Sequence, residues 1–260
     1  MIAPALQFLK ETAADHCASA VEVGGNSGCF VVCPPKASGA PGRSYRLRIS
    51  VAGELAAARE EIPRHLPKFC AERHINPGGS FCLSWSERDP LPVVNPASAS
   101  RWWGTLLVFL NHQETAEQLK RWPGPARAHG QDAAKAQAKA IAAAESLGEG
   151  FVSWLQDGRL TAMRSDGRTG RKFGLRLDGK RLLTVDRCRS RVLGRRTLCP
   201  CRAPSATTKR IRVCGAHEKS FVTLTLALDA WKRAEAEYTR SLRYQGAKCC
   251  GTIRVCPLAV

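Results

Sequence analysis

The sequence lacks the long hydrophobic runs of a membrane protein. No apolar run approaches the roughly 18 residues that a membrane-spanning helix needs. Residues 1–10 also lack the basic region and the long apolar core of a signal peptide. These absences argue against a membrane-bound or exported protein, so we expect a cytoplasmic protein with no membrane partner.

Specific nucleic-acid-binding motifs are lacking as well. The chain has a net charge of +18, but it contains no helix-turn-helix pattern or zinc-finger spacing, and few aromatic residues interleave with the basic ones. Residues 1–125 contain 13 Lys or Arg and 11 Asp or Glu, whereas residues 126–260 contain 27 and 11. A surface this basic suits nucleic acid or an acidic protein, so nucleic acid is a nonspecific candidate partner.

The uneven charge predicts two domains with different partners. Between them, residues 132–147 combine high helix propensity with few large apolar side chains, which is typical of an exposed or connecting helix. We therefore predict a first domain at 1–125, an Ala-rich helical linker at 126–150 and a basic, cysteine-rich domain at 151–260.

Local patterns predict an α+β fold for the first domain. Helical spacing of apolar residues predicts an N-terminal helix over 3–20 and a second helix over 103–121. Runs at 28–33 and 44–51 predict two antiparallel strands, because the second of them alternates apolar and polar residues. The Ala- and Glu-rich stretch at 54–66 has a more helical character.

The pattern of the last part of the chain also predicts an α+β fold. Short, partly alternating runs separated by Asp-Gly and Thr-Gly turns predict an antiparallel β-meander at 151–187, with the clearest hairpin at Asp178 and Gly179. An amphipathic helix is predicted over 219–243, and we expect it to pack on the meander.

The 12 cysteines suggest a metal site. In a reducing compartment, cysteines are thiols or metal ligands rather than disulfides. A C-x-C pair and a C-x-x-H pair supply four ligands that suit a structural, tetrahedral zinc ion, and the predicted set is Cys199, Cys201, Cys214 and His217. Alternative ligands are Cys188, Cys249, Cys250 and Cys256. The alternative to a metal site is a set of buried thiols, and core packing is the interpretation that we favour for Cys17, Cys29, Cys33 and Cys70.

The candidate catalytic residues lie in the stretch 70–85. His74, Asn76 and Cys82 flank a Pro-Gly-Gly sequence that predicts a tight turn, which would bring Cys82 back towards the other two. A thiolate near an amide donor can perform acyl transfer, because the amide can stabilise the oxyanion. Cys82 could instead be a buried apolar side chain, Asn76 could hold its own turn, and His74 could act as a base, although we favour a structural role for it.

These residues resemble the core of ubiquitin-conjugating enzymes over about 1–125. The H-x-N pattern, the Gly-containing turn, the Cys-Leu pair and a Trp before a helix occur in that family in this order. Ile75 replaces the usual proline, and the step from Asn76 to Cys82 is short. Both features look like the divergent bacterial members, which occur in antiviral defence operons with an activating enzyme and a ubiquitin-like protein.

The resemblance implies a fold, partners and a reaction. The fold would be a ubiquitin-conjugating-like antiparallel meander with flanking helices, followed here by a small, basic α+β zinc-binding domain. The activating enzyme would pass the ubiquitin-like protein to Cys82 as a thioester, and a lysine amine of a protein substrate would attack it. Asn76 would support the oxyanion, His74 would order the loop, and no small-molecule cofactor is implied.

Two other function classes fit parts of the sequence. A cysteine hydrolase would use Cys82 as its nucleophile and His74 or His112 as its base, but no sequence feature secures the contact between the sulfur and an imidazole that such an enzyme needs. A zinc-containing nucleic-acid-binding protein would use the basic half and leave the first half catalytically idle.

Overall fold

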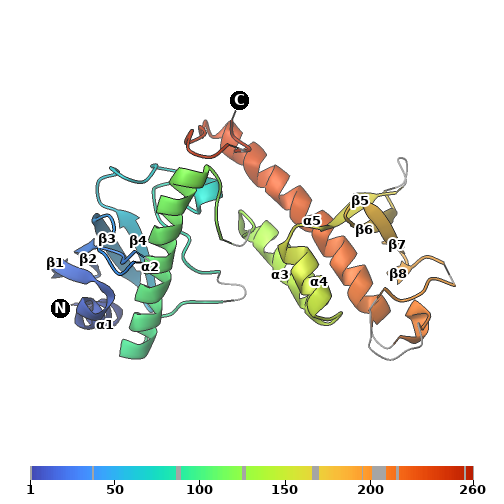
Figure 1. The fold of residues 1–260 in the computed structure, drawn as a ribbon, viewed down its shortest axis with the longest axis horizontal. Coiled ribbons are helices and arrows are strands. Elements are labelled where there is room, and N and C mark those ends of the chain that lie inside the picture. Colours follow the sequence, from blue (N-terminus) through green and yellow to red (C-terminus); the bar gives the residue numbers. More distant parts are fainter. Residues whose placement is uncertain are drawn as a thin grey trace. The chain divides into compact units, whose positions relative to one another are not determined.

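The fold is described from a computed structural model (Figure 1). The structure describes residues 2–36, 38–85, 89–124, 127–165, 170–194, 196–200, 209–214, 217–254 and 256–259. The chain divides into two compact units, of which the first comprises Met1–Gly124 with Gly246–Val260 and the second comprises Pro125–Gln245. Each unit is described by itself. Within the described ranges, no helix is long and apolar enough to cross a membrane.

The first unit contains a four-stranded antiparallel meander. Its strands are adjacent in sequence order, and they are β1 (Ala18–Gly24), β2 (Ser27–Val32), β3 (Tyr45–Ala52) and β4 (Leu55–Glu60). Alternate residues of β3 are buried, as its period-2 pattern predicts. The meander expected from the family resemblance is therefore present in the first unit.

Two helices pack with this sheet to form the core of the first unit. They are α1 (Pro4–Thr12) and α2 (Pro96–Leu119), and their buried residues belong to the same cluster as those of the sheet. Trp102 and Trp103 are fully buried; the Trp103 indole N–H donates to the carbonyl oxygen of Leu9 at 3.0 Å. Both tryptophans therefore belong to the core of the first unit.

Residues 55–60 form strand β4, so the more helical character expected for 54–66 is wrong. Gly53 adopts a φ of +61° in the turn that precedes β4, and the strand then pairs along its whole length with β3. Alanine and glutamate favour helices only weakly, so the hydrogen bonds and burial that the neighbouring strand offers outweigh this preference.

The helices of the first unit also differ in length from the prediction. The N-terminal helix ends at Thr12, and the chain reverses at Cys17, whose φ is 53°, before β1 begins. Helix α2 starts at Pro96 rather than at 103. Its start is set by Asn95, whose side chain accepts a hydrogen bond from the Ser98 N–H at 2.9 Å, while the Ser98 hydroxyl accepts one from the Asn95 N–H at 3.0 Å.

The second unit contains another four-stranded antiparallel sheet. Its strands are again in sequence order, and they are β5 (Leu160–Arg164), β6 (Lys172–Leu177), β7 (Lys180–Asp186) and β8 (Arg191–Val192). Asp178 and Gly179 connect β6 to β7 with φ values of 50° and 76°, which are typical of a type I′ turn. The predicted hairpin is confirmed, although residues 149–156 form helix α4 (Glu149–Gln156) instead of a strand.

Helix α5 (His217–Tyr244) packs on this sheet and along helix α3 (Gln131–Glu145), as Figure 1 shows. Five alanines of α3 are buried, which lets the two helices lie close together: Ala133, Ala136, Ala140, Ala143 and Ala144. Residues 131–145 are thus part of the second unit, which differs from the linker expected at 126–150. The sequence does not predict this interface, because a single alanine is only weakly hydrophobic and the close packing of the two helices depends on the small size of its side chain.

The C-terminal segment 246–260 belongs to the first unit, which differs from its expected place in a domain at 151–260. The Arg254 N–H donates to the carbonyl oxygen of Lys120 at 2.9 Å. Ile253 is buried in a small cluster with Cys70 and Ala116. The two terminal parts of the sequence therefore share one compact unit.

Candidate functional site

The stretch that contains the candidate catalytic residues begins with a closed loop. A short 3-10 helix (η2, Ala71–Arg73) follows Cys70, and the chain turns back at His74, whose φ is 54°. Cys70 and Ile75 then exchange two backbone hydrogen bonds, of 3.1 and 3.0 Å. This closure fixes where the segment that carries Asn76 begins.

A tight turn follows over residues 76–79. The Gly79 N–H donates to the carbonyl oxygen of Asn76 at 2.9 Å, and the Asn76 N–H donates to that of Ser80 at 2.8 Å. Pro77 fixes its own φ, and Gly78 has a φ of +89°, as a type II turn requires at this position. The predicted chain reversal at Pro-Gly-Gly is confirmed.

The two faces of this hairpin have different environments. Ile75 pairs with Phe81, both are buried, and the Phe81 ring stacks on Phe109 with centroids 4.8 Å apart. Because side chains alternate along extended strands, Asn76 and Cys82 lie on the face opposite Phe81. Asn76 is exposed and Cys82 is half-buried. Core packing on one face therefore positions the candidate catalytic residues on the other.

Backbone hydrogen bonds also tie the hairpin to the sheet. The Phe81 N–H donates to the carbonyl oxygen of Ala58 at 2.8 Å, and Ser80 forms a bridge with Arg59 of β4. The Asn76 side-chain amide donates to the Ser80 hydroxyl at 3.3 Å. A contact this long on an exposed face leaves the amide available to a ligand at small cost.

His74 and Cys82 are joined through the backbone, since the Cys82 N–H donates to the His74 carbonyl oxygen at 2.8 Å. The Cys82 thiol donates to the carbonyl oxygen of Ser84 at 3.8 Å. His74 is 6% exposed, and its ring lies edge-on to Trp122, with centroids 4.8 Å apart. Trp122 also contacts His112, at 5.3 Å. This packing suits the structural role that the sequence favours for His74.

Two further residues hold the base of this loop, and sequence reasoning missed them. The Arg73 guanidinium donates to the Gln113 side-chain oxygen at 2.7 Å and to the Gln113 carbonyl oxygen at 3.1 Å. The Gln113 amide donates back to the Arg73 carbonyl oxygen at 2.6 Å. Both side chains are fully buried. The only sequence signal was a glutamine on the apolar side of a predicted helix.

Three of the predicted metal ligands come together in the second unit. The His217 Nδ1 lies 3.5 Å from the Cys199 sulfur and 3.3 Å from the Cys214 sulfur, and the three ligand atoms lie within 4.8 Å of one another. Metal–ligand bonds of about 2.0 Å to nitrogen and about 2.3 Å to sulfur place such atoms about 3.5 Å apart around a tetrahedral zinc ion. The spacing therefore fits a metal such as zinc.

Different elements supply these ligands. Cys199 is held by a hydrogen bond from its N–H to the Lys209 carbonyl oxygen (2.9 Å), Cys214 follows a short 3-10 helix (η3, Ile211–Val213), and His217 begins α5. The fourth predicted ligand, Cys201, lies outside the described residues. Cys188 is exposed in the turn between β7 and β8.

Of the cysteines assigned to the core, Cys29 and Cys70 are buried, Cys33 is half-buried and Cys17 is exposed. The assignment of Cys17 is wrong because a strand, rather than the helix expected over 3–20, starts next to it.

Comparison with known families agrees with this geometry. Residues 18–124 match the family described as "Prokaryotic E2 domain", and residues 128–258 match the family described as "Cysteine-rich domain, C-terminal to E2 domain". The chain belongs to this family of prokaryotic E2 proteins with a cysteine-rich C-terminal domain. No curated protein and no solved structure matches the chain. The E2 domain supports a ubiquitin-conjugating-like role, with a ubiquitin-like protein and an activating enzyme as partners.

The cysteine-rich region of the family spans both compact units. Its match continues to residue 258, whereas residues 246–260 pack in the unit that holds the E2 domain. The described cysteines of this region therefore form two groups. Cys188, Cys199 and Cys214 lie in the second unit, and Cys249, Cys250 and Cys256 lie in the unit that holds the E2 domain.

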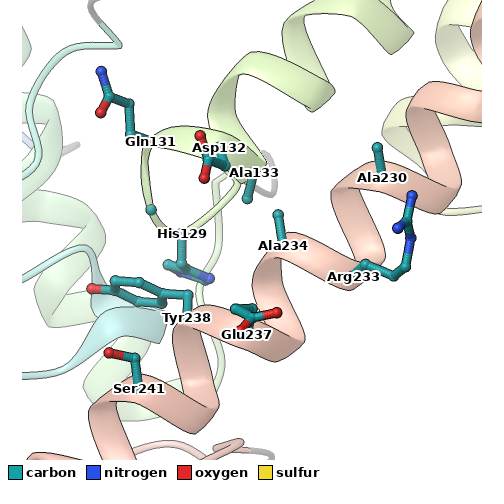
Figure 2. Close-up of a pocket in the computed structure, with 11 residues that line it drawn as sticks. His129, Gln131, Asp132, Ala133, Ala230, Arg233, Ala234, Glu237, Tyr238 and Ser241 are labelled. Atoms are coloured by element: carbon teal, nitrogen blue, oxygen red, sulfur yellow. The ribbon is translucent and has the colours of Figure 1, made fainter.

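The cysteine-rich domain also contains an open pocket of about 420 Å³ between the start of α3 and α5 (Figure 2). The His129 ring lies nearly parallel to Tyr238, with centroids 6.5 Å apart. Asp132, Arg233 and Glu237 contribute charges of both signs to the lining. The lining therefore gives the pocket no preference for anions, although the domain as a whole is basic.

Proposed function

We propose that this protein is a conjugating enzyme that carries a ubiquitin-like protein as a thioester on Cys82. The observation that carries the proposal is the placement of Cys82 and Asn76 on the outer face of a core-anchored hairpin within a prokaryotic E2 domain. This arrangement presents a thiol and an amide donor on one face and fixes both through the backbone. Such pre-positioning is what acyl transfer requires.

The reaction has two steps. In the first, the Cys82 thiolate attacks the thioester carbonyl carbon of the charged activating enzyme, a new C–S bond forms, the C–S bond to the activating enzyme breaks, and the cysteine of the activating enzyme leaves as a thiolate. In the second, a lysine amine attacks the same carbon, the C–N bond forms, and Cys82 leaves as a thiolate while the amine loses its proton to solvent or a nearby base. The Asn76 amide would turn from Ser80 to the oxyanion of each tetrahedral intermediate.

His74 would hold the loop rather than act as a base. Its ring is buried against Trp122, and its carbonyl oxygen accepts the Cys82 N–H. This packing supports the role that the family resemblance implies for His74, which is to order the loop that carries Asn76 and Cys82.

The cysteine-rich domain would have a structural zinc ion bound by Cys199, Cys201, Cys214 and His217, and zinc would supply the cross-link that closes its loops. Its 27 basic residues among 126–260 would recruit an acidic protein target, with nucleic acid as the other candidate. From the resemblance in the sequence, we extend the proposal to a bacterial antiviral defence pathway in the cytoplasm.

The test is intact-protein mass spectrometry after incubation with an activating enzyme, ATP and a ubiquitin-like protein encoded by the same operon. We expect one adduct that dithiothreitol removes and that Cys82→Ala abolishes. Cys33→Ala is the matched control, because Cys33 is a half-buried thiol of the same unit, and it should leave the adduct unchanged. A charged activating enzyme that leaves Cys82 unmodified would contradict the proposal.

A further inference from the structure

Two cysteines that are far apart in the chain meet in the first unit. The Cys250 sulfur lies 2.8 Å from the Cys70 sulfur, although 180 residues separate the two positions. Cys70 begins the loop of the candidate active site and is buried, whereas Cys250 belongs to the C-terminal segment 246–260 and is half-buried. Both side chains pack in one small cluster with Ala116 and Ile253. The pair therefore joins the loop to the C-terminal segment.

Neighbouring contacts fix the position of Cys250. The Arg254 N–H donates to the carbonyl oxygen of Lys120 at 2.9 Å. The Arg73 guanidinium donates to the Thr252 hydroxyl at 3.1 Å, and this hydroxyl lies 3.1 Å from the Cys250 sulfur. The contact between the two sulfurs is thus one of several that this segment makes with the rest of the first unit.

The separation of the two sulfurs fits a pair that can form a disulfide rather than two ligands of one metal ion. Bonds of about 2.3 Å from zinc to sulfur place two thiolates about 3.8 Å apart around a tetrahedral ion. The bond between the sulfurs of a disulfide is about 2.05 Å long, so atoms that lie 2.8 Å apart must approach by only about 0.8 Å. Small rotations about the side-chain bonds supply a movement of this size.

We propose that Cys70 and Cys250 form a reversible disulfide bond when a hydroperoxide oxidises them. The bond would fasten the C-terminal segment covalently to the loop of the candidate active site. Disulfides in reducing compartments are usually transient and catalytic or redox-sensing, so this bond would form under oxidative conditions and be reduced again by cellular thiols. The proposal does not depend on the thioester chemistry of Cys82.

The reaction consumes one molecule of hydrogen peroxide and two thiols. The Cys250 sulfur, which is the more exposed of the two, attacks a peroxide oxygen as a thiolate; the S–O bond forms, the O–O bond breaks, and the leaving hydroxide takes up the thiol proton as water. The Cys70 sulfur then attacks the Cys250 sulfur, the S–S bond forms, the S–O bond breaks, and hydroxide leaves with the Cys70 proton as a second water. The two thiols together lose two electrons, and the peroxide gains them.

Peptide mapping of the full chain without reduction tests this inference. The chain is treated with one equivalent of hydrogen peroxide, and the remaining thiols are then alkylated. Mass spectrometry should find two peptides joined through Cys70 and Cys250, which dithiothreitol separates. Cys250→Ser should abolish the joined peptides, whereas the matched control Cys33→Ser, which replaces a half-buried cysteine of the same unit, should retain them. An oxidised wild-type chain without this pair would overturn the proposal.

A measurement on the wild-type chain alone shows whether the fold selects the pair. In urea-unfolded chain, the entropy of loop closure favours pairing of Cys250 with the nearby Cys249 or Cys256 over Cys70. The yield of the Cys70–Cys250 pair should therefore be at least tenfold higher in the folded protein. Equal yields in the folded and the unfolded chain would overturn the proposal, as would Cys249 or Cys256 as the main partner of Cys250 in the folded protein.

Discussion

Phe81→Ala tests whether the buried face of the hairpin holds the candidate active site in place. Phe81 is 6% exposed and stacks on Phe109 at the heart of the first unit. Truncation of a buried phenylalanine to alanine costs about 3–5 kcal/mol. Ser80→Ala is the matched control. Ser80 directly precedes Phe81 in the chain but lies on the outer face of the hairpin, where a substitution changes the free energy of unfolding by about 0.5 kcal/mol or less.

Hydrogen exchange of the β3 amides measures this cost in the first unit alone, because the slowest amides of a central strand report its complete unfolding. Since each 1.4 kcal/mol corresponds to a factor of ten, Phe81→Ala should accelerate their exchange by roughly two to three and a half orders of magnitude, and Ser80→Ala by about twofold at most. Similar acceleration by both variants, or none by Phe81→Ala, would refute the assignment of an inner and an outer face.

Three more predictions follow from the geometry. Asn76→Ala should slow transfer from Cys82 to lysine by about 10²- to 10³-fold, the usual cost of losing one oxyanion donor, in single-turnover discharge assays; an unchanged rate would contradict that role. Gly179→Val should destabilise the second unit by about 1–2 kcal/mol in urea unfolding, since its φ of 76° disfavours a branched side chain; Lys180→Val, in the adjacent strand position, is the control. Hydrogen bonds from Arg46, Cys29 and Arg48 lower the pKa of Glu61 from 4.5 to about 2. A carboxyl group whose pKa is lowered in the folded state stabilises the protein above pH 4.5, and this stabilisation is lost as the pH falls to about 2. Glu61→Gln should therefore weaken the pH dependence of the free energy of unfolding between these two pH values. An unchanged pH dependence would argue against the interaction.

The backbone preferences of a few adjacent residues made much of the hairpin that carries Asn76 and Cys82 predictable. Pro77 and Gly78 specify a turn by their own backbone preferences, so the return of the chain towards Cys82 could be read from the sequence. The Asp178-Gly179 turn was predictable for the same reason. In both places the conformation depends on residues that are adjacent in the chain.

Features that depend on distant partners were not predictable in this way. Strand β4 forms because β3 lies beside it, although its alanines and glutamates favour a helix on their own. Gln113 and Arg73 are 40 residues apart, and no local pattern marks them as partners. Cys70 and Cys250 are separated by 180 residues, so spacing could not select them as neighbours.

The chemical nature of the adduct on Cys82→Ser tests the central claim most directly. If the ubiquitin-like protein is bonded to the side-chain atom of residue 82, replacement of sulfur by oxygen must convert a thioester into an ester. We predict that the wild-type adduct is cleaved by dithiothreitol, whereas the Cys82→Ser adduct resists dithiothreitol and is cleaved by mild alkali. An adduct that keeps its sensitivity to dithiothreitol in Cys82→Ser would contradict the account, because the carrier sulfur would then lie elsewhere in the chain.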